Sequence, residues 1–116
     1  VIHVSSYGFS AKGKKGCPTE IGSNVTIGHN ATIHACSIAN FALIGMGSVI
    51  LDQAVIKEYS LIAAGALVTP GSVINERELW AGNPAKLIRK ISSKEQDLLI
   101  NTPEVYSNLS KEFLKK

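Results

Sequence analysis

Residues 21–50 read IGSNVTIGHNATIHACSIANFALIGMGSVI, and a large apolar residue recurs in this stretch at almost every sixth position. The same period continues to residue 80, with one interval of five between Ile33 and Ile38. A period of six matches neither the helical turn nor the simple alternation of a long strand. The chain must therefore turn at short, regular intervals. The recurring residues are Ile21, Ile27, Ile33, Ile38, Ile44, Ile50, Ile56, Ile62, Val68, Ile74 and Trp80.

Each hexapeptide is interpreted as one short strand and one corner. Three hexapeptides then close a triangular coil of about eighteen residues, and successive coils stack as parallel strands about 4.8 Å apart. The aliphatic residues point inward, so Ile27, Ile44 and Ile62 are expected to form an internal ladder. Four places after each aliphatic residue stands a small or β-branched residue that fits near a corner: Val25, Ala31, Ser37, Ala42, Ser48, Ala54, Ser60, Ala66 and Ser72. A residue free to turn often follows the aliphatic residue directly: Gly22, Gly28, Ala39, Gly45 and Ala63.

The composition of the 116 residues fits one domain with a buried core, because 45% of them are hydrophobic and 18% are charged. Disordered chains and coiled coils are excluded. The net charge of +3 is scattered and aromatic residues are few, which argues against nucleic-acid binding. No apolar run of about 18 residues is present, so no transmembrane segment is predicted. Cys17 and Cys36 form no C-x-x-C pair and are interpreted as free thiols.

The repeat defines the first of two predicted parts, an all-β solenoid over residues 1–88. The chain opens directly on the strand-like run Val1–Val4 without an initiator Met, so we expect N-terminal coils to be missing. Residues 5–19, rich in Gly, Ser and Lys, are interpreted as a looped-out excursion from the coil. The run Trp80–Ala85 contains Gly and Pro and ends the period.

The second predicted part is a C-terminal helical segment over residues 89–116. Ser92 and Glu95 have the spacing of a capping box at the start of a short helix. Thr102 followed by Pro103 predicts the start of a terminal α-helix with an apolar stripe.

His3 and His34 have equivalent places in the repeat, since each directly follows an inward-pointing aliphatic residue. They are 31 residues apart, which corresponds to one coil of eighteen residues and the thirteen-residue loop Ser5–Cys17. With the loop set aside, the two imidazoles stack on adjacent coils about 4.8 Å apart. This spacing suits two ligands of one metal ion.

His29 is too far from His34 along one coil to bind the same ion, because five extended residues cover about 16 Å. Nitrogen ligands of one zinc ion lie within about 3.5 Å of each other. A complete site therefore needs His29 from a neighbouring subunit, which favours a cyclic trimer. The alternative is that these are ordinary surface histidines of a repeat.

The segments Ile27–His29, Ile33–Ile38 and Ile44–Val49 resemble the signature of the gamma-class carbonic anhydrases. The resemblance implies a left-handed parallel β-helix followed by a C-terminal α-helix, assembled as a trimer. It implies a metal ion at the subunit boundary, with His3 and His34 from one subunit and His29 from the next. The expected ion is Zn²⁺, with Fe²⁺ and Co²⁺ as alternatives, and the expected reaction is the hydration of CO2 to bicarbonate by a metal-bound hydroxide.

Tyr106 and Asn108 match a late Tyr-x-Asn of the same family, which implies that they approach the catalytic site from the terminal helix. A buried tyrosine on an apolar stripe is the alternative. The run Tyr106–Leu109 together with Trp80–Lys86 looks most like the mitochondrial gamma-type subunits attached to the membrane arm of respiratory complex I. That likeness favours the matrix side of the inner mitochondrial membrane, with the bacterial cytoplasm as the alternative.

Three functions follow as hypotheses. The first is a gamma-type carbonic anhydrase acting on CO2 and bicarbonate. The second is a structural or assembly subunit of complex I, in a homo- or heterotrimer with gamma-carbonic-anhydrase-like subunits. The third is an acyl-CoA transferase of the hexapeptide-repeat class, suggested by Gly82–Lys86.

Overall fold

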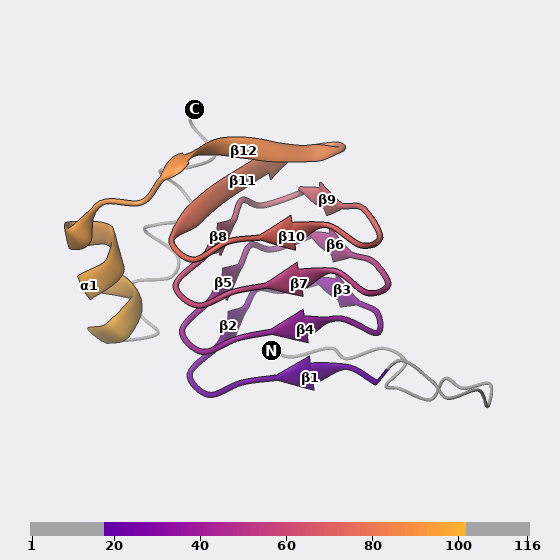
Figure 1. The fold of residues 1–116 in the computed structure, drawn as a ribbon, viewed down its shortest axis with the longest axis horizontal. Helices are drawn as coiled ribbons and strands as arrows, with labels where there is room; N and C mark the ends of the chain where they lie inside the picture. The colour runs from indigo at the N-terminus through magenta and orange to yellow at the C-terminus, as the bar shows by residue number, and fades with distance from the viewer. Residues whose placement is uncertain (1–17, 102–116) are drawn as a thin grey trace.

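The computed structural model describes residues 18–101, whose stacked coils form a three-sided parallel β-solenoid (Figure 1). The predicted ligand His3, the pair Tyr106 and Asn108, and the terminal helix predicted from Thr102 lie outside the described residues. The strands are β1 (Glu20–Ile21), β2 (Thr26–Ile27), β3 (Thr32–Ile33), β4 (Ser37–Ile38), β5 (Leu43–Ile44), β6 (Val49–Ile50), β7 (Val55–Ile56), β8 (Leu61–Ile62), β9 (Leu67–Val68), β10 (Val73–Ile74), β11 (Glu78–Gly82) and β12 (Ala85–Lys90). One α-helix, α1 (Ser93–Asn101), follows them.

Three parallel sheets form the sides of the solenoid, and each takes its name here from its first strand. The β1 sheet has the order β1-β4-β7-β10, and the β3 sheet has the order β3-β6-β9. The β2 sheet has the order β12-β11-β8-β5-β2. Strands that pair are seventeen or eighteen residues apart in sequence, as the three-hexapeptide coil predicts.

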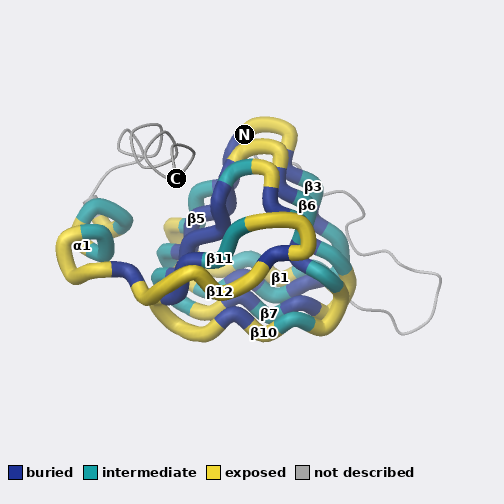
Figure 2. The backbone as a smooth tube through the Cα atoms, turned by 90° about the horizontal axis from the view of Figure 1, so that it is seen from above, coloured by how far each residue is buried: buried dark blue, intermediate teal, exposed yellow. Residues whose placement is uncertain are grey.

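The predicted internal ladders are confirmed by the strand register. Ile27 pairs with Ile44 and Ile44 with Ile62 in the β2 sheet. The inward residues between Ile27 and Ile74 are buried and form one continuous core, which Figure 2 shows in dark blue, and the partly buried Ile21 and Trp80 pack against it. Each fully buried isoleucine contributes about 1.5–3 kcal/mol to folding, so the ladders are the main source of stability.

The small residue of the repeat occupies an inward position two places before each aliphatic residue. Counting backward from Ile38 gives Cys36, which is 3% exposed, whereas the predicted Ser37 is half-buried in β4. The prediction was wrong here because the five-residue interval removes one residue from the corner before β4. Elsewhere the predicted positions hold. The buried Ser48 and Ser60 fit the core because their hydroxyls donate to backbone carbonyls, Ser48 Oγ to Ala63 O at 3.0 Å among them.

The corners turn on a residue with positive φ rather than on the glycines predicted for this role. Positive φ falls on the second corner residue, which is Gly at some corners but also Phe41, Tyr59 and Arg77. Gly22 and Gly45, which follow aliphatic residues, serve close packing between coils instead. A Cβ on Gly45 would lie 2.5 Å from Ala64 N, and this backbone atom could move away only if the next coil shifted.

An antiparallel hairpin closes one end of the solenoid, which the sequence analysis did not predict. β11 continues the β2 sheet, where Trp80 pairs with Ile62 and takes the next place in the ladder above it. The chain then turns at Gly82–Pro84 and returns as β12. The hairpin covers the last coil, so the stacked core does not end on an exposed layer of isoleucines (Figure 1).

The helix α1 begins with the predicted capping box. The Glu95 N–H donates to Ser92 Oγ at 3.1 Å, and the Ser92 N–H donates to Glu95 Oε1 at 2.8 Å. Leu98 and Leu99 pack beside the outer face of the β2 sheet. Among residues 18–101, no helix has the length and hydropathy needed to cross a membrane.

Candidate metal centre

His29 and His34 stand on either side of β3, on two consecutive corners of the same coil. His29 is the exposed first residue of the corner before β3. His34 directly follows β3 and is half-buried. The two histidines therefore lie at opposite ends of β3, at the two corners that bound the β3 sheet. These two corners are called the edges of that sheet below.

Backbone hydrogen bonds to the next coil fix both histidines. His29 O accepts from Gly47 N at 2.9 Å, and the His34 N–H donates to Ile50 O at 3.0 Å. These bonds set the Cα positions of both residues before any ligand binds, which lowers the entropic cost of forming a site.

One chain does not complete a metal site within residues 18–101. No group of three or more His, Cys, Asp or Glu side chains there lies close enough to hold a metal ion. The third predicted ligand, His3, lies outside the described residues. The donor chemistry nevertheless fits a divalent ion such as Zn²⁺, because neutral imidazole is among its preferred ligands.

The outer face of the β3 sheet between the two histidines carries apolar and small side chains. Thr32, Val49 and Leu67 occupy the outward positions of its three strands, and all three are only half-buried. No described helix covers this face, since α1 lies beside the β2 sheet (Figure 2). These side chains leave the face partly exposed and mostly apolar.

Apolar residues also occupy the places of both histidines one coil further along. The register puts Met46 next to His29 and Leu51 next to His34. Met46 is one of the few large hydrophobic residues in residues 18–101 that are exposed, at 37%. This pair was not predicted from the sequence, although both residues follow a histidine at a spacing of seventeen residues.

Cys36 does not add a ligand to this centre, although it follows His34 by two residues. Its side chain belongs to the core. Burial, with a smaller contribution from the negative charge of Asp52, raises the pKa of the Cys36 thiol to about 12. The thiol therefore keeps its proton at neutral pH, whereas metal ligation requires the thiolate.

Comparisons with known proteins give close relatives but no matching family model. The chain is 40% identical over 110 residues to gamma carbonic anhydrase 1, mitochondrial, of Arabidopsis thaliana, covering 95% of this chain and 39% of that protein. It is 38% identical over 114 residues to protein YrdA of Escherichia coli, covering 98% of this chain and 59% of that protein. The chain thus spans about two fifths to three fifths of the length of these relatives.

A solved structure supports the same relationship at the level of the fold. The crystal structure of a hexapeptide transferase family protein from Anaplasma phagocytophilum is similar to this chain with a TM-score of 0.72 and 45% identity. The similarity covers 82% of this chain and 57% of that one. The predicted fold class, a left-handed parallel β-helix of hexapeptide repeats followed by an α-helix, is confirmed.

Proposed function

Because the chain is a homologue of proteins named gamma carbonic anhydrase, we propose that it holds a divalent metal ion and hydrates CO2 to bicarbonate. The observation that carries the proposal is the placement of His29 and His34. They flank β3 on one coil, and the chain around them is 40% identical to a gamma carbonic anhydrase.

The metal ligands in this proposal are His3, His29 and His34. When bound, a zinc ion held by three neutral imidazoles acts as a Lewis acid and makes hydroxide available near neutral pH. Fe²⁺ and Co²⁺ suit the same donors. The chain itself contributes by positioning the ligands, because backbone hydrogen bonds to the next coil fix His29 and His34 in place.

The proposed site forms between subunits of a trimer, with His29 from one subunit and His34 and His3 from the next. The partly exposed outer face of the β3 sheet supports this assembly, because His29 lies at one of its edges and His34 lies at the other. A contact there would cover Val49 and Leu67 and bring opposite edges of neighbouring sheets together.

The hydration adds the oxygen of hydroxide to the carbon of CO2 and leaves one proton to remove for every turnover. The loop Ser5–Cys17 contains no acidic residue that would carry this proton. We therefore expect it to pass directly to water or buffer, so that the rate rises with the concentration of buffer. Tyr106 and Asn108 remain predicted contributors from the terminal segment.

The experiment that tests the shared site mixes two variants of the full-length protein. His29→Ala and His34→Ala chains are each expected to lose bound metal and CO2 hydration. After unfolding and refolding together in equal amounts, about a quarter of the sites recover, because a complete site needs one chain of each kind in a fixed order. Metal content by mass spectrometry and stopped-flow CO2 hydration measure both quantities. A wild-type assembly without metal, or variants that keep it, would contradict the proposal.

A purely structural role is the second candidate, in which the trimer serves the assembly of mitochondrial complex I. The mitochondrial relative in Arabidopsis favours the organelle, whereas the relative in Escherichia coli favours a bacterial cytoplasm. If assembly is the main role, co-purification with complex I survives His29→Ala. Loss of co-purification in that variant counts against it.

An acyl-CoA transferase is the third candidate, since the structural neighbour from Anaplasma phagocytophilum is described as a hexapeptide transferase family protein. Gly82–Lys86, which suggested it, form the turn of the terminal hairpin and the start of β12. Binding of acetyl-CoA by isothermal titration calorimetry would favour this function over the first.

A further inference from the structure

A surface pocket of about 260 Å³ lies where the terminal hairpin meets the corner between the β1 and β2 sheets. Its lining comes from three separate segments of the chain. Lys57 follows β7, Asn75–Arg77 form the corner after β10, and Lys90 ends β12. None of these residues belongs to the proposed metal centre.

Specific contacts join the end of the hairpin to the corner that lines this pocket. The Ile91 N–H donates to Arg77 O at 2.9 Å, and Lys90 Nζ donates to Glu76 O at 3.3 Å. On the other side, Arg77 N donates to Glu58 O at 3.1 Å. The backbone that carries the lining side chains is therefore fixed in position by neighbouring segments.

Cationic side chains outnumber carboxylates in the lining. Lys57, Arg77 and Lys90 face the pocket together with only one acidic residue, Glu76. Like charges gathered in one pocket repel each other unless an anion lies between them. The pocket thus has an electrostatic preference for a negatively charged ligand.

The neighbouring buried carboxylate of Glu78 offsets only one of these three positive charges, that of Lys90. Glu78 is 7% exposed, and its Oε1 accepts from Asn75 N at 2.9 Å and from Trp80 Nε1 at 3.0 Å. Its Oε2 lies 4.0 Å from Lys90 Nζ. Within residues 18–101, no carboxylate comes within 4.0 Å of Lys57 or Arg77.

The size of the pocket limits the ligand to a small group. Sites for drug-sized ligands begin at about 300 Å³, which is more than this pocket offers. Two ammonium groups, one guanidinium and an Asn75 amide supply several hydrogen-bond donors in a small space. Such a set of donors matches the oxygen atoms of a phosphate group.

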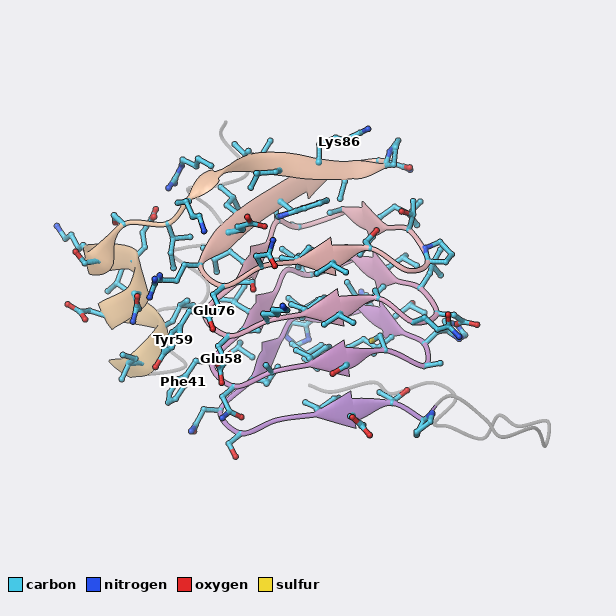
Figure 3. The ribbon with its side chains drawn as sticks, viewed as in Figure 1. Phe41, Glu58, Tyr59, Glu76 and Lys86 are labelled. Atoms are coloured by element: carbon cyan, nitrogen blue, oxygen red, sulfur yellow. The ribbon has the colours of Figure 1, made fainter. Side chains whose placement is uncertain are left out.

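We propose that the pocket formed by Lys57, Asn75, Arg77 and Lys90 binds the phosphate group of a small anion, at a site separate from the metal centre. Glu76 sets a limit on the affinity, because its carboxylate lies in the same lining. Glu58 has the equivalent place one coil away (Figure 3), and it does not belong to the lining.

The test is a titration of the full-length protein with inorganic phosphate at pH 7.5 and constant ionic strength, followed by the amide signals of Asn75–Arg77 in NMR spectra. A parallel titration with glycerol phosphate distinguishes a free phosphate from a phosphate ester. Saturable shifts with either ligand, absent with chloride, are the expected result. Shifts no larger than those with chloride would overturn the proposal.

Three substitutions sharpen the test. Arg77→Asn is suited to the φ of 58° at this position, because Asn tolerates positive φ, and it removes the guanidinium. Loss of this charge-assisted contact is expected to weaken phosphate binding about tenfold. Lys57→Gln is expected to weaken it as well. Lys86→Gln, on the hairpin but outside the lining, is the control and leaves the affinity unchanged.

The carboxylates provide a test of opposite sign. Glu76→Gln removes the one negative charge of the lining and should tighten phosphate binding, whereas the matched Glu58→Gln should change it less. Equal effects of the two substitutions, or an unchanged affinity in Arg77→Asn with intact NMR spectra elsewhere, would contradict the proposal. Metal content is measured in the same samples and is expected to stay constant.

Discussion

The outer faces of the β2 and β3 sheets differ although the same repeat builds both. On the β2 sheet the outward residues Leu43, Leu61 and Leu79 are all buried beneath α1 and the segment that leads into it. On the β3 sheet the equivalent residues are only half-buried, and no described helix covers them. The hexapeptide fixes what points inward, and the residue before each inward aliphatic decides what each face can contact.

This difference indicates which face is free for another subunit. In the β2 sheet the outward leucines of β5, β8 and β11 are covered by an element of the same chain. The β3 sheet offers apolar residues and has a histidine at each edge. The assembly proposed above therefore predicts opposite responses to substitutions on the two faces.

The largest effect is expected from Leu61→Ala on the covered face. Leu61 is 0% exposed, so its truncation leaves a cavity between β8 and the elements packed on it, at a cost of about 2–5 kcal/mol in the free energy of unfolding. Denaturation in guanidinium chloride measures this loss. Val73→Ala, on the β1 sheet and 48% exposed, is the control and should cost far less. Similar losses for both would mean that α1 does not protect this face in solution.

A different effect is expected from Leu67→Asp on the uncovered face. A carboxylate there meets water in the free subunit but loses its hydration in a subunit contact. We expect association to weaken by about 2 kcal/mol, or roughly thirtyfold, with the circular dichroism spectrum retained. Sedimentation velocity measures the mass of the assembly. Val73→Asp, on the β1 sheet, should leave that mass unchanged. If Val73→Asp dissociated the assembly and Leu67→Asp did not, the subunit contact would involve the β1 sheet and not the β3 sheet.

The sequence was sufficient for the features that repeat. The period of six alone predicted the ladder of Ile27, Ile44 and Ile62, because every hexapeptide places its aliphatic residue in the same core. The capping box at Ser92 and Glu95 was also predictable, since it depends on two residues three places apart. Both are local rules that hold whatever lies elsewhere in the fold.

The features that the sequence did not predict depend on neighbouring coils. Gly45 was interpreted as a turn residue, but its role is set by the backbone of Ala64 in the next coil. The five-residue interval moved the inward position to Cys36, because register is kept by pairing with the coil above. The terminal hairpin was missed for the same reason, since Gly and Pro near residue 83 mark a turn without showing which strands it joins.

A smaller effect is expected from Ser92→Ala. This substitution tests how firmly α1, the helix that covers the β2 sheet, is held in place. The substitution removes the hydroxyl that accepts from Glu95 N, and the loss of such a cap costs about 1 kcal/mol. Hydrogen exchange should speed up in α1 and not in β3 or β6. Ser93→Ala, one residue further along and exposed, is the control. Equal exchange rates in both variants would show that the cap does not hold the helix in place.

The smallest effect is expected from the charge on Glu95, which joins the same helix to the hairpin. Arg89 donates to both carboxylate oxygens of Glu95, at 2.9 and 2.8 Å. These hydrogen bonds, opposed by partial burial and assisted by those from Ser92, lower the pKa of the Glu95 carboxyl. Because the folded pKa lies below the unfolded value of about 4.3, the ionised carboxylate stabilises the fold above that pH. The contribution is lost as the pH falls through the folded pKa.

The measurement compares the free energy of unfolding at pH 7 and pH 3 in the wild type and in Glu95→Gln. The wild type should lose more stability on acidification than the variant, by less than about 1 kcal/mol because the Arg89 side chain is 40% exposed and solvent screens the pair. Asp97→Asn, on the same helix and exposed, should behave like the wild type. If Glu95→Gln lost as much stability on acidification as the wild type, the Arg89–Glu95 ion pair would not contribute to the free energy of unfolding. The packing of α1 against the β2 sheet would then depend on the leucines of the helix and on the Ser92 cap.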